Sequence, residues 1–269
     1  MRSVNSFSAA LAAALFLLPV SANAGEGAFG GLSGDWYLSV GVAGIVAPNF
    51  EGGKKYLFNA SPLISLGKAG NAVRFSSRND NISLALVDDG NVRAGLTGKL
   101  LWGRDNGDDV LRGLDPVRWG GEVGGFIEVY PLDWMRLRGE LRQGIRSHHG
   151  IVADIAADAF YDVTPDIRVS GGPRMSMASA GYFDAYYGVS AAESVASKLS
   201  RYNPGGGLKS AGVGGAITWK VTDPVTASVF GEYSRLMGPA ADSSLVKERG
   251  DRNQYMFGVS ATYRFDFTL

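Results

Sequence analysis

The last seventeen residues of the chain constrain the fold most strongly, because apolar side chains occupy every second position there. These positions are Tyr255, Phe257, Val259, Ala261, Tyr263, Phe265, Phe267 and Leu269. A period of two puts alternate side chains on opposite faces of a β-strand. The segment therefore predicts a long strand with one apolar face, which either a second sheet or membrane lipid would cover.

The same alternation recurs along the chain and is clearest over residues 135–146. Met135, Leu137 and Leu141 fall on one face of this predicted strand, and arginines fall on the other. The arginines are Arg136, Arg138, Arg142 and Arg146. No strand in a soluble core needs so many arginines on one side, whereas the lumen of a membrane barrel is polar. The pattern favours a barrel whose apolar face meets lipid.

The connections between the predicted strands alternate between short and long. Turns such as Asp88-Asp89-Gly90-Asn91 are short, whereas the loops over residues 103–118 and 177–207 are long. Outer-membrane barrels combine short periplasmic turns with long external loops. The predicted fold class is therefore all-β, a single antiparallel transmembrane β-barrel of about twelve strands covering residues 25–269.

One stretch does not fit a regular strand. Val73 and Phe75 are apolar at odd positions, whereas Ile82, Leu84 and Leu86 are apolar at even ones. Such a change of parity forces a bulge or a break. We expect two short strands here, with one bulged strand over residues 72–87 as the alternative.

The C-terminal strand resembles the closing strand of outer-membrane barrels, whose aromatic end serves as an assembly signal. On that resemblance the assembly strand carries Tyr263, Phe265, Phe267 and Leu269. The barrel assembly machinery and outer-membrane lipid are then the expected partners.

Residues 1–24 predict a secretory signal peptide. Arg2 supplies the positive charge, an apolar stretch follows, and Ala22-Asn23-Ala24 is a small-residue cleavage site. Cleavage near Ala24 would deliver the mature chain toward the outer membrane. The absence of cysteine excludes a lipoprotein anchor, disulfides and thiolate metal sites. The formal net charge of +0 gives no basic excess that would indicate nucleic acid, and no metal or cofactor is expected.

The polar faces of three consecutive predicted strands carry opposite charges. The predicted luminal strip consists of Arg136, Arg138, Arg142, Arg146, Glu122, Glu128, Asp154 and Asp158. Because side chains on neighbouring strands pair across the ladder, Glu128 is expected among the partners of Arg138. The strip has two interpretations: a selectivity filter for an anionic or zwitterionic solute, or salt bridges that fill a narrow barrel.

A catalytic site is not expected. Ser147-His148-His149 brings both histidines beside a serine, as in outer-membrane lipid hydrolases. However, adjacent residues of a strand point to opposite faces, so Ser147 and His148 cannot form a local dyad.

Several motifs together resemble one family. They are Pro48-Asn49-Phe50-Glu51-Gly52, Leu111-Arg112-Gly113-Leu114, Gly172-Pro173-Arg174, Tyr186-Tyr187-Gly188-Val189-Ser190, Gly205-Gly206-Gly207-Leu208, Glu232-Tyr233-Ser234-Arg235-Leu236 and Ala240-Ala241-Asp242-Ser243. The chain resembles the MipA/OmpV family of MltA-interacting proteins and their relatives over nearly all of its mature length. The resemblance implies a non-enzymatic scaffold that brings a lytic transglycosylase together with a peptidoglycan synthase.

The segment over residues 182–199 is expected on the external side. Ala191, Val195 and Leu199 are spaced by four residues, which predicts a short helix. We expect this segment to fold over or into the barrel mouth, where its aromatic side chains pack. These are Tyr182, Phe183, Tyr186 and Tyr187. The alternatives to the scaffold are a narrow channel for small anionic or zwitterionic solutes and, third, a lipid hydrolase.

Overall fold

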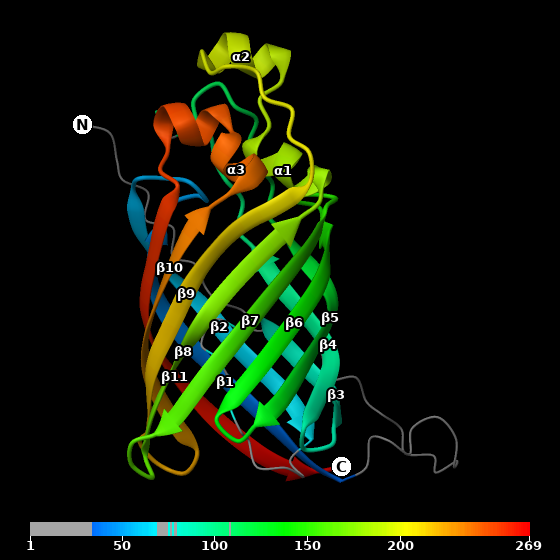
Figure 1. The fold of residues 1–269 in the computed structure, drawn as a ribbon, viewed down its shortest axis with the longest axis vertical. Helices are drawn as coiled ribbons and strands as arrows, with labels where there is room; N and C mark the ends of the chain where they lie inside the picture. The colour runs from blue at the N-terminus through cyan, green and yellow to red at the C-terminus, as the bar shows by residue number, and fades with distance from the viewer. Residues whose placement is uncertain (1–33, 69–74, 76, 78–79, 108) are drawn as a thin grey trace, which may run out of the picture. The chain divides into compact units, whose positions relative to one another are not determined.

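Eleven β-strands close into a barrel in the computed structural model, which describes residues 34–68, 75, 77, 80–107 and 109–269 (Figure 1). The strands are β1 (Asp35–Pro48), β2 (Tyr56–Lys68), β3 (Ile82–Asp88), β4 (Val92–Leu101), β5 (Gly120–Leu132), β6 (Met135–Ile145), β7 (Ile151–Asp162), β8 (Ile167–Ala178), β9 (Gly207–Lys220), β10 (Val225–Leu236) and β11 (Asn253–Thr268). The all-β barrel is as expected, but the expected count of about twelve strands is wrong. The predicted signal peptide lies outside the described residues.

Each strand pairs with its neighbour in sequence, and β1 pairs with β11 to close the barrel. The closing ladder is long, from Asp35–Thr268 to Val46–Phe257. The strand that the terminal alternation predicts is therefore present as β11, and it seals the wall.

The barrel has eleven strands because the short strand expected around Val73 and Phe75 is not among the described strands of the wall. Val73, in the expected extra strand, lies outside the described residues, and Phe75 belongs to no strand. Phe75 is buried instead, and Asp80 contacts Arg136 of β6. Because the chain turns inward here, β2 and β3 run in the same direction and pair in parallel, through Ser65–Ser83 and Leu66–Leu84. The change of parity thus marks a break in the wall and not a twelfth strand.

The two ends of the barrel differ (Figure 1). At one end, here called the turn end, short turns join β3 to β4, β5 to β6, β7 to β8 and β9 to β10. The opposite end, the loop end, carries α1 (Ala180–Tyr187), α2 (Ala191–Ser197), α3 (Gly238–Asp242) and the π-helical turn η1 (Leu245–Arg249). No helix in the described ranges is long and apolar enough to cross a membrane.

The outer face of the wall is apolar and carries aromatic side chains near both ends. The exposed aromatic residues are Trp134, Tyr161, Trp219, Tyr263, Phe265 and Phe267 toward the turn end, and Tyr56, Phe58, Trp102, Trp119, Tyr255 and Phe257 toward the loop end. From Tyr255 to Phe265 the exposed side chains of β11 are those at odd positions, whereas Gln254 and Ser260 face inward and are buried. Two aromatic girdles around an apolar band are the arrangement that suits a barrel in lipid.

Candidate functional site: the lumen and its cap

The centre of the lumen is Arg136, whose side chain is fully buried. Its Nη1 lies 2.6 Å from Asp80 Oδ2 and 3.0 Å from Glu128 Oε1, and its Nη2 lies 2.6 Å from Asp158 Oδ2. Side chains alternate between the two faces of a strand, and in β6 the odd-numbered residues lie on the outer surface, so the even-numbered residues face inward. A single guanidinium therefore joins three separate parts of the barrel interior.

Arg138 and Arg142 extend this network along β6. Arg138 pairs with Glu128, which lies directly opposite it in the β5–β6 ladder, so the pairing expected from the sequence is present. Arg142 Nε lies 2.7 Å from Glu122 Oε2, and Arg142 Nη2 lies 2.5 Å from Asp154 Oδ2. Every guanidinium in this row has carboxylate partners, so the row carries little uncompensated charge.

The predicted luminal strip leaves out five other members of the network. They are Asp80, Asn81, Arg93, Glu140 and Arg174. Glu140 lies between Arg138 and Arg142 on the inward face of β6 and contacts both, so the alternation alone could have identified it. Asp80 and Asn81 precede β3 in a segment without alternation. The change of parity indicated a break in this segment but did not show which of its residues would face the lumen.

The prediction that Arg146 belongs to the luminal strip is wrong. Arg146 follows the last residue of β6, has a φ of 73° and is exposed. Its guanidinium carbon lies 3.9 Å from the centroid of the Trp119 ring. The left-handed backbone ends the alternation one residue after Ile145, and the side chain leaves the lumen.

An aromatic cluster lies beside the network. Phe75 and Phe160 stack with ring centroids 4.8 Å apart, and Tyr130 packs with them. The Tyr130 hydroxyl donates to the Phe75 carbonyl oxygen at 3.1 Å. Arg136 lies over the Phe75 ring, 4.8 Å from its centroid. These contacts anchor the inward segment before β3 inside the barrel.

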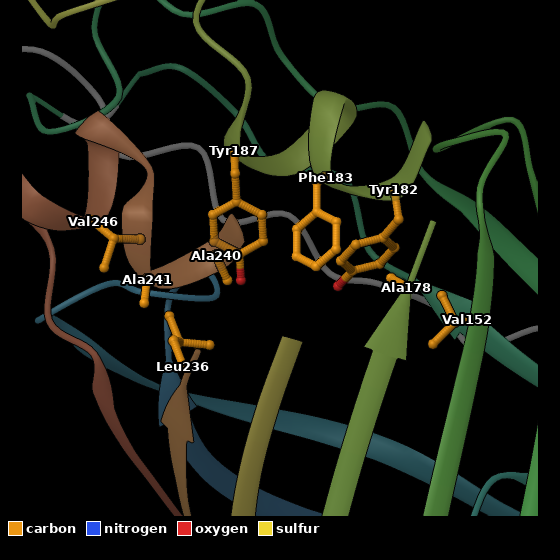
Figure 2. Close-up of a cluster of buried hydrophobic side chains, with 9 residues drawn as sticks. All are labelled: Val152, Ala178, Tyr182, Phe183, Tyr187, Leu236, Ala240, Ala241 and Val246. Carbon is orange, nitrogen blue, oxygen red and sulfur yellow. The ribbon is translucent and has the colours of Figure 1, made fainter. Parts of the chain in front are cut away.

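The loop end is closed by a second structure, here called the cap, formed by α1, α2, α3, η1 and the loops around them. Tyr182, Phe183 and Tyr187 are buried and point from α1 toward the strand ends, whereas Tyr186 is partly buried (Figure 2). The cluster in Figure 2 comprises Val152, Ala178, Tyr182, Phe183, Tyr187, Leu236, Ala240, Ala241 and Val246. The four aromatic residues predicted at the mouth therefore lie together, and α2 occurs where the four-residue spacing predicts a helix.

A second apolar cluster holds the outer layer of the cap. It contains Phe50, Leu111, Leu114, Val189, Leu199 and Leu245. Gly113 has a φ of 83°, and a Cβ there would lie 2.5 Å from the Ser197 backbone nitrogen. Only glycine suits that position, because it combines a left-handed backbone with close contact to the end of α2.

A polar group lies beneath the cap. Glu51 accepts hydrogen bonds from the hydroxyls of Tyr182 at 2.5 Å and Tyr187 at 3.0 Å, and Lys209 Nζ lies 2.9 Å from its Oε1. Burial alone would raise the pKa of Glu51, but the charge of Lys209 and these hydrogen bonds hold it below its ordinary value. Burial and the neighbouring Glu51 carboxylate raise the pKa of Tyr182 well above its usual range. Tyr182 is therefore a neutral donor to an ionised Glu51.

A cavity of about 480 Å³ separates the network from the cap. Arg138, Glu140 and Asp154 line it from the network, and Phe50 and Glu51 line it from the cap. The lumen therefore holds an internal space between the charged network and the cap.

The chain matches the family described as MltA-interacting protein MipA over residues 40–265. It belongs to this family. Family membership and the lipid-facing wall make this MipA-family chain an outer-membrane β-barrel protein. The comparison with curated proteins gave no match.

Solved barrels resemble the MipA-family chain only distantly. A bacterial polysaccharide outer membrane secretin has a TM-score of 0.42 and 11% identity, covering 85% of this chain and 98% of that one. Neisserial surface protein A has a TM-score of 0.28 and 10% identity, with coverages of 86% and 99%. OprG from Pseudomonas aeruginosa has a TM-score of 0.30 and 9% identity, with coverages of 87% and 96%. With TM-scores below 0.5, these similarities carry no functional argument.

Most of the motifs behind the family resemblance meet in the cap. Phe50 and Glu51 come from the first motif, Leu111 and Leu114 from the second, and Tyr187 from the block in α1. Ser190 caps α2 in a capping box with Glu193, and Ser243 Oγ donates to the Tyr187 carbonyl oxygen at 2.8 Å. In this MipA-family barrel, these motifs therefore build the cap at the loop end.

His148 does not form a catalytic pair with Ser147, since the Ser147 hydroxyl has no hydrogen-bond partner in the part of the chain that the structure describes. His148 is buried, with its Nε2 3.1 Å from Glu122 Oε1 and its Nδ1 accepting from the Gly150 backbone nitrogen at 3.1 Å. Both ring nitrogens are thus engaged, and neither is free to act as a general base toward a serine. Among the described residues, no group of three or more His, Asp or Glu side chains is arranged to hold a metal ion.

Proposed function

We propose that this protein is a non-conducting, non-enzymatic scaffold of the cell envelope. The observation that carries the proposal is the fully buried Arg136, which binds Asp80, Glu128 and Asp158 and so fills the lumen with paired charges. A solute would have to break these ion pairs to pass. The cap closes the mouth above them.

The balance of charge argues against a selectivity filter. A filter attracts its ion through charges that are free to coordinate it, whereas Arg136, Arg138 and Arg142 are at most 5% exposed and each contacts at least two carboxylates. The luminal strip supports the second of its two interpretations, the filling of a narrow barrel.

The partner follows from the family description. MltA-interacting protein names a murein transglycosylase as the partner, and we extend this to a complex that also holds a peptidoglycan synthase. In outer-membrane barrels the short turns face the periplasm, so the turn end is the side from which such enzymes would be reached. The turns offer Asp89, Asp133, Asp166 and Asp223 to a partner.

Two measurements on the refolded barrel test the proposal. We expect no steady conductance in planar bilayers, and saturable binding of a purified MltA-type transglycosylase to the barrel in lipid nanodiscs. A variant with Asp133 and Asp166 replaced by lysine should bind more weakly if the turn end is the docking face. Replacing Asp109 and Asp115 at the loop end in the same way is the matched control.

The outcomes separate the alternatives. Steady conductance with an anion preference would overturn the non-conducting barrel and favour the narrow channel. A silent barrel that binds neither murein enzyme would overturn the scaffold. Release of fatty acid from outer-membrane lipid, lost in His148→Ala, would favour the lipid hydrolase.

A further inference from the structure

Among the described residues, strand pairing on both sides of β3 is short. β3 is short, and its ladder with β4 ends at Ile82–Gly98, so residues 99–101 of β4 extend past it. On its other side, β3 meets β2 only at Ser65–Ser83 and Leu66–Leu84. Within the described residues, positions 56–64 of β2 and 99–101 of β4 have no strand partner on the sides that face one another. We call this gap the lateral slot.

The slot lies in the half of the wall nearer the loop end, where lipid would meet it. An open strand edge is not tolerated against hydrocarbon, because its backbone N–H and C=O groups find no partners there; it is tolerated where it lines a polar cavity. The 480 Å³ cavity supplies this condition, because both edges line it, β2 through Pro62 and Leu63 and β4 through Lys99 and Leu100. Leu100 and Trp102, which are exposed on the outer face, also line this cavity, so the slot connects the cavity with the lipid-facing surface.

The outer flanks of the slot are apolar. Phe58 on β2 is 71% exposed, and Leu100 and Trp102 beside β4 are 54% and 67% exposed. A hydrocarbon chain lying against these side chains would remain in contact with bilayer lipid. The flanks suit a molecule that leaves only its polar part inside the cavity.

Lys99 stands at the inner side of the slot. It is half-buried and lines the cavity, and no hydrogen bond or ion pair reaches its ammonium group from the described residues. Glu122, opposite it in the β4–β5 ladder, is held by Arg142, and Glu51 is held by Lys209. Asp154 also interacts electrostatically with Lys99, but it forms its ion pair with Arg142. The nearby carboxylates thus have other cations, and Lys99 is available to an incoming anion.

We propose that the lateral slot admits a phosphate-bearing membrane amphiphile, whose phosphate binds Lys99 and whose acyl chain lies against Leu100 and Trp102. This site is separate from the scaffold role, since it needs no protein partner. Two sources share the chemistry, a phospholipid and a phosphorylated glycolipid such as lipid A.

The first test asks whether the slot opens to lipid. The chain contains no cysteine, so Ser61→Cys and Ser234→Cys each carry a single thiol. Both serines are half-buried and line the cavity, but Ser234 lies in a wall paired on both sides. A maleimide attached directly to the headgroup of a bilayer lipid should label Ser61→Cys at least about tenfold faster. Equal rates would overturn the slot.

The second test asks whether Lys99 recognises phosphate. Native mass spectrometry of the full barrel should show bound phosphatidylglycerol or lipid A, with at least about fivefold weaker binding in Lys99→Ala. Lys220→Ala, which removes an exposed lysine at the turn end, should bind as the wild type does. Equal loss in both variants, or inorganic phosphate competing as strongly as the lipids, would overturn the proposed site. Whichever lipid binds more tightly identifies the source.

Discussion

Arg136 shows how much one residue contributes to the charged network in the lumen. Its guanidinium compensates Asp80, Glu128 and Asp158 in a site without exposed surface. Removing one partner of a buried ion pair leaves uncompensated charge, which costs about 3–5 kcal/mol. We expect Arg136→Ala to lower the free energy of unfolding in lipid vesicles by that amount. Arg112→Ala removes an exposed pair with Asp109 and should cost about 0–1 kcal/mol; equal costs would contradict the buried network.

Glu51 gives the cap a dependence on pH. Because its pKa in the folded protein lies below the ordinary value of 4.5, ionised Glu51 stabilises the cap. That contribution is complete above pH 4.5 and is lost as the pH falls toward the folded-state pKa. We expect the near-ultraviolet circular dichroism of the cap tyrosines to change over this range. Glu51→Gln should lack this pH-dependent change in circular dichroism, and its cap should be less stable at neutral pH. Glu248→Gln, at an exposed site, should retain the change.

The sequence predicted the luminal residues only where strands were regular. Alternation in β5, β6 and β7 was enough to bring Arg138 to Glu128, because a ladder fixes which inward residues meet. It failed at Arg146, where a left-handed backbone interrupts the period. It could not find Asp80, because a residue in a segment without periodicity has no predictable direction. The contact of Lys209 with Glu51 joins residues 158 positions apart and left no local signal.

At the scale of elements, β11 has the strongest sequence signal and the clearest test. Val259 lies near the middle of β11, pairs with Val229 and is 58% exposed on the outer face. An arginine at the bilayer midplane costs about 2–4 kcal/mol, and about 0–1 kcal/mol near an interface. We expect Val259→Arg to destabilise the folded barrel by the larger amount and Val221→Arg, beyond the end of β9, by the smaller. Equal effects in urea titrations would contradict the lipid-facing assignment.

The elements that sequence could not define are those whose environment is not periodic. β3 is bulged between Ala85 and Val87 and pairs in parallel with β2. Side chains alternate with a period of two in both parallel and antiparallel strands, so the alternation does not predict that β3 pairs in parallel with β2. The cap aromatics were easier to identify, because Tyr182, Phe183 and Tyr187 are too apolar to remain in water.

At the scale of the whole molecule, the network and the cap lie in series along the barrel axis. Their resistances to ion flow add, so opening one barrier leaves the other to limit the current. Replacing residues 180–204 with a short Gly-Ser linker removes α1 and α2 from the cap. Replacing Arg136, Arg138, Glu140 and Arg142 with serine removes the centre of the network together with its neighbours on β6. We expect either variant alone to stay nearly silent in planar bilayers, and the combination to conduct steadily.

Heat-modifiable migration on gels would first establish that each variant has folded. Conductance from the linker variant alone would mean that Arg136 and its neighbours leave a path for ions, and the closed lumen that supports the scaffold would be lost. Conductance from the network variant alone would mean that the cap is leaky despite its two apolar clusters. Silence in the combined variant would move the principal barrier to Phe75 and Phe160, which neither change removes.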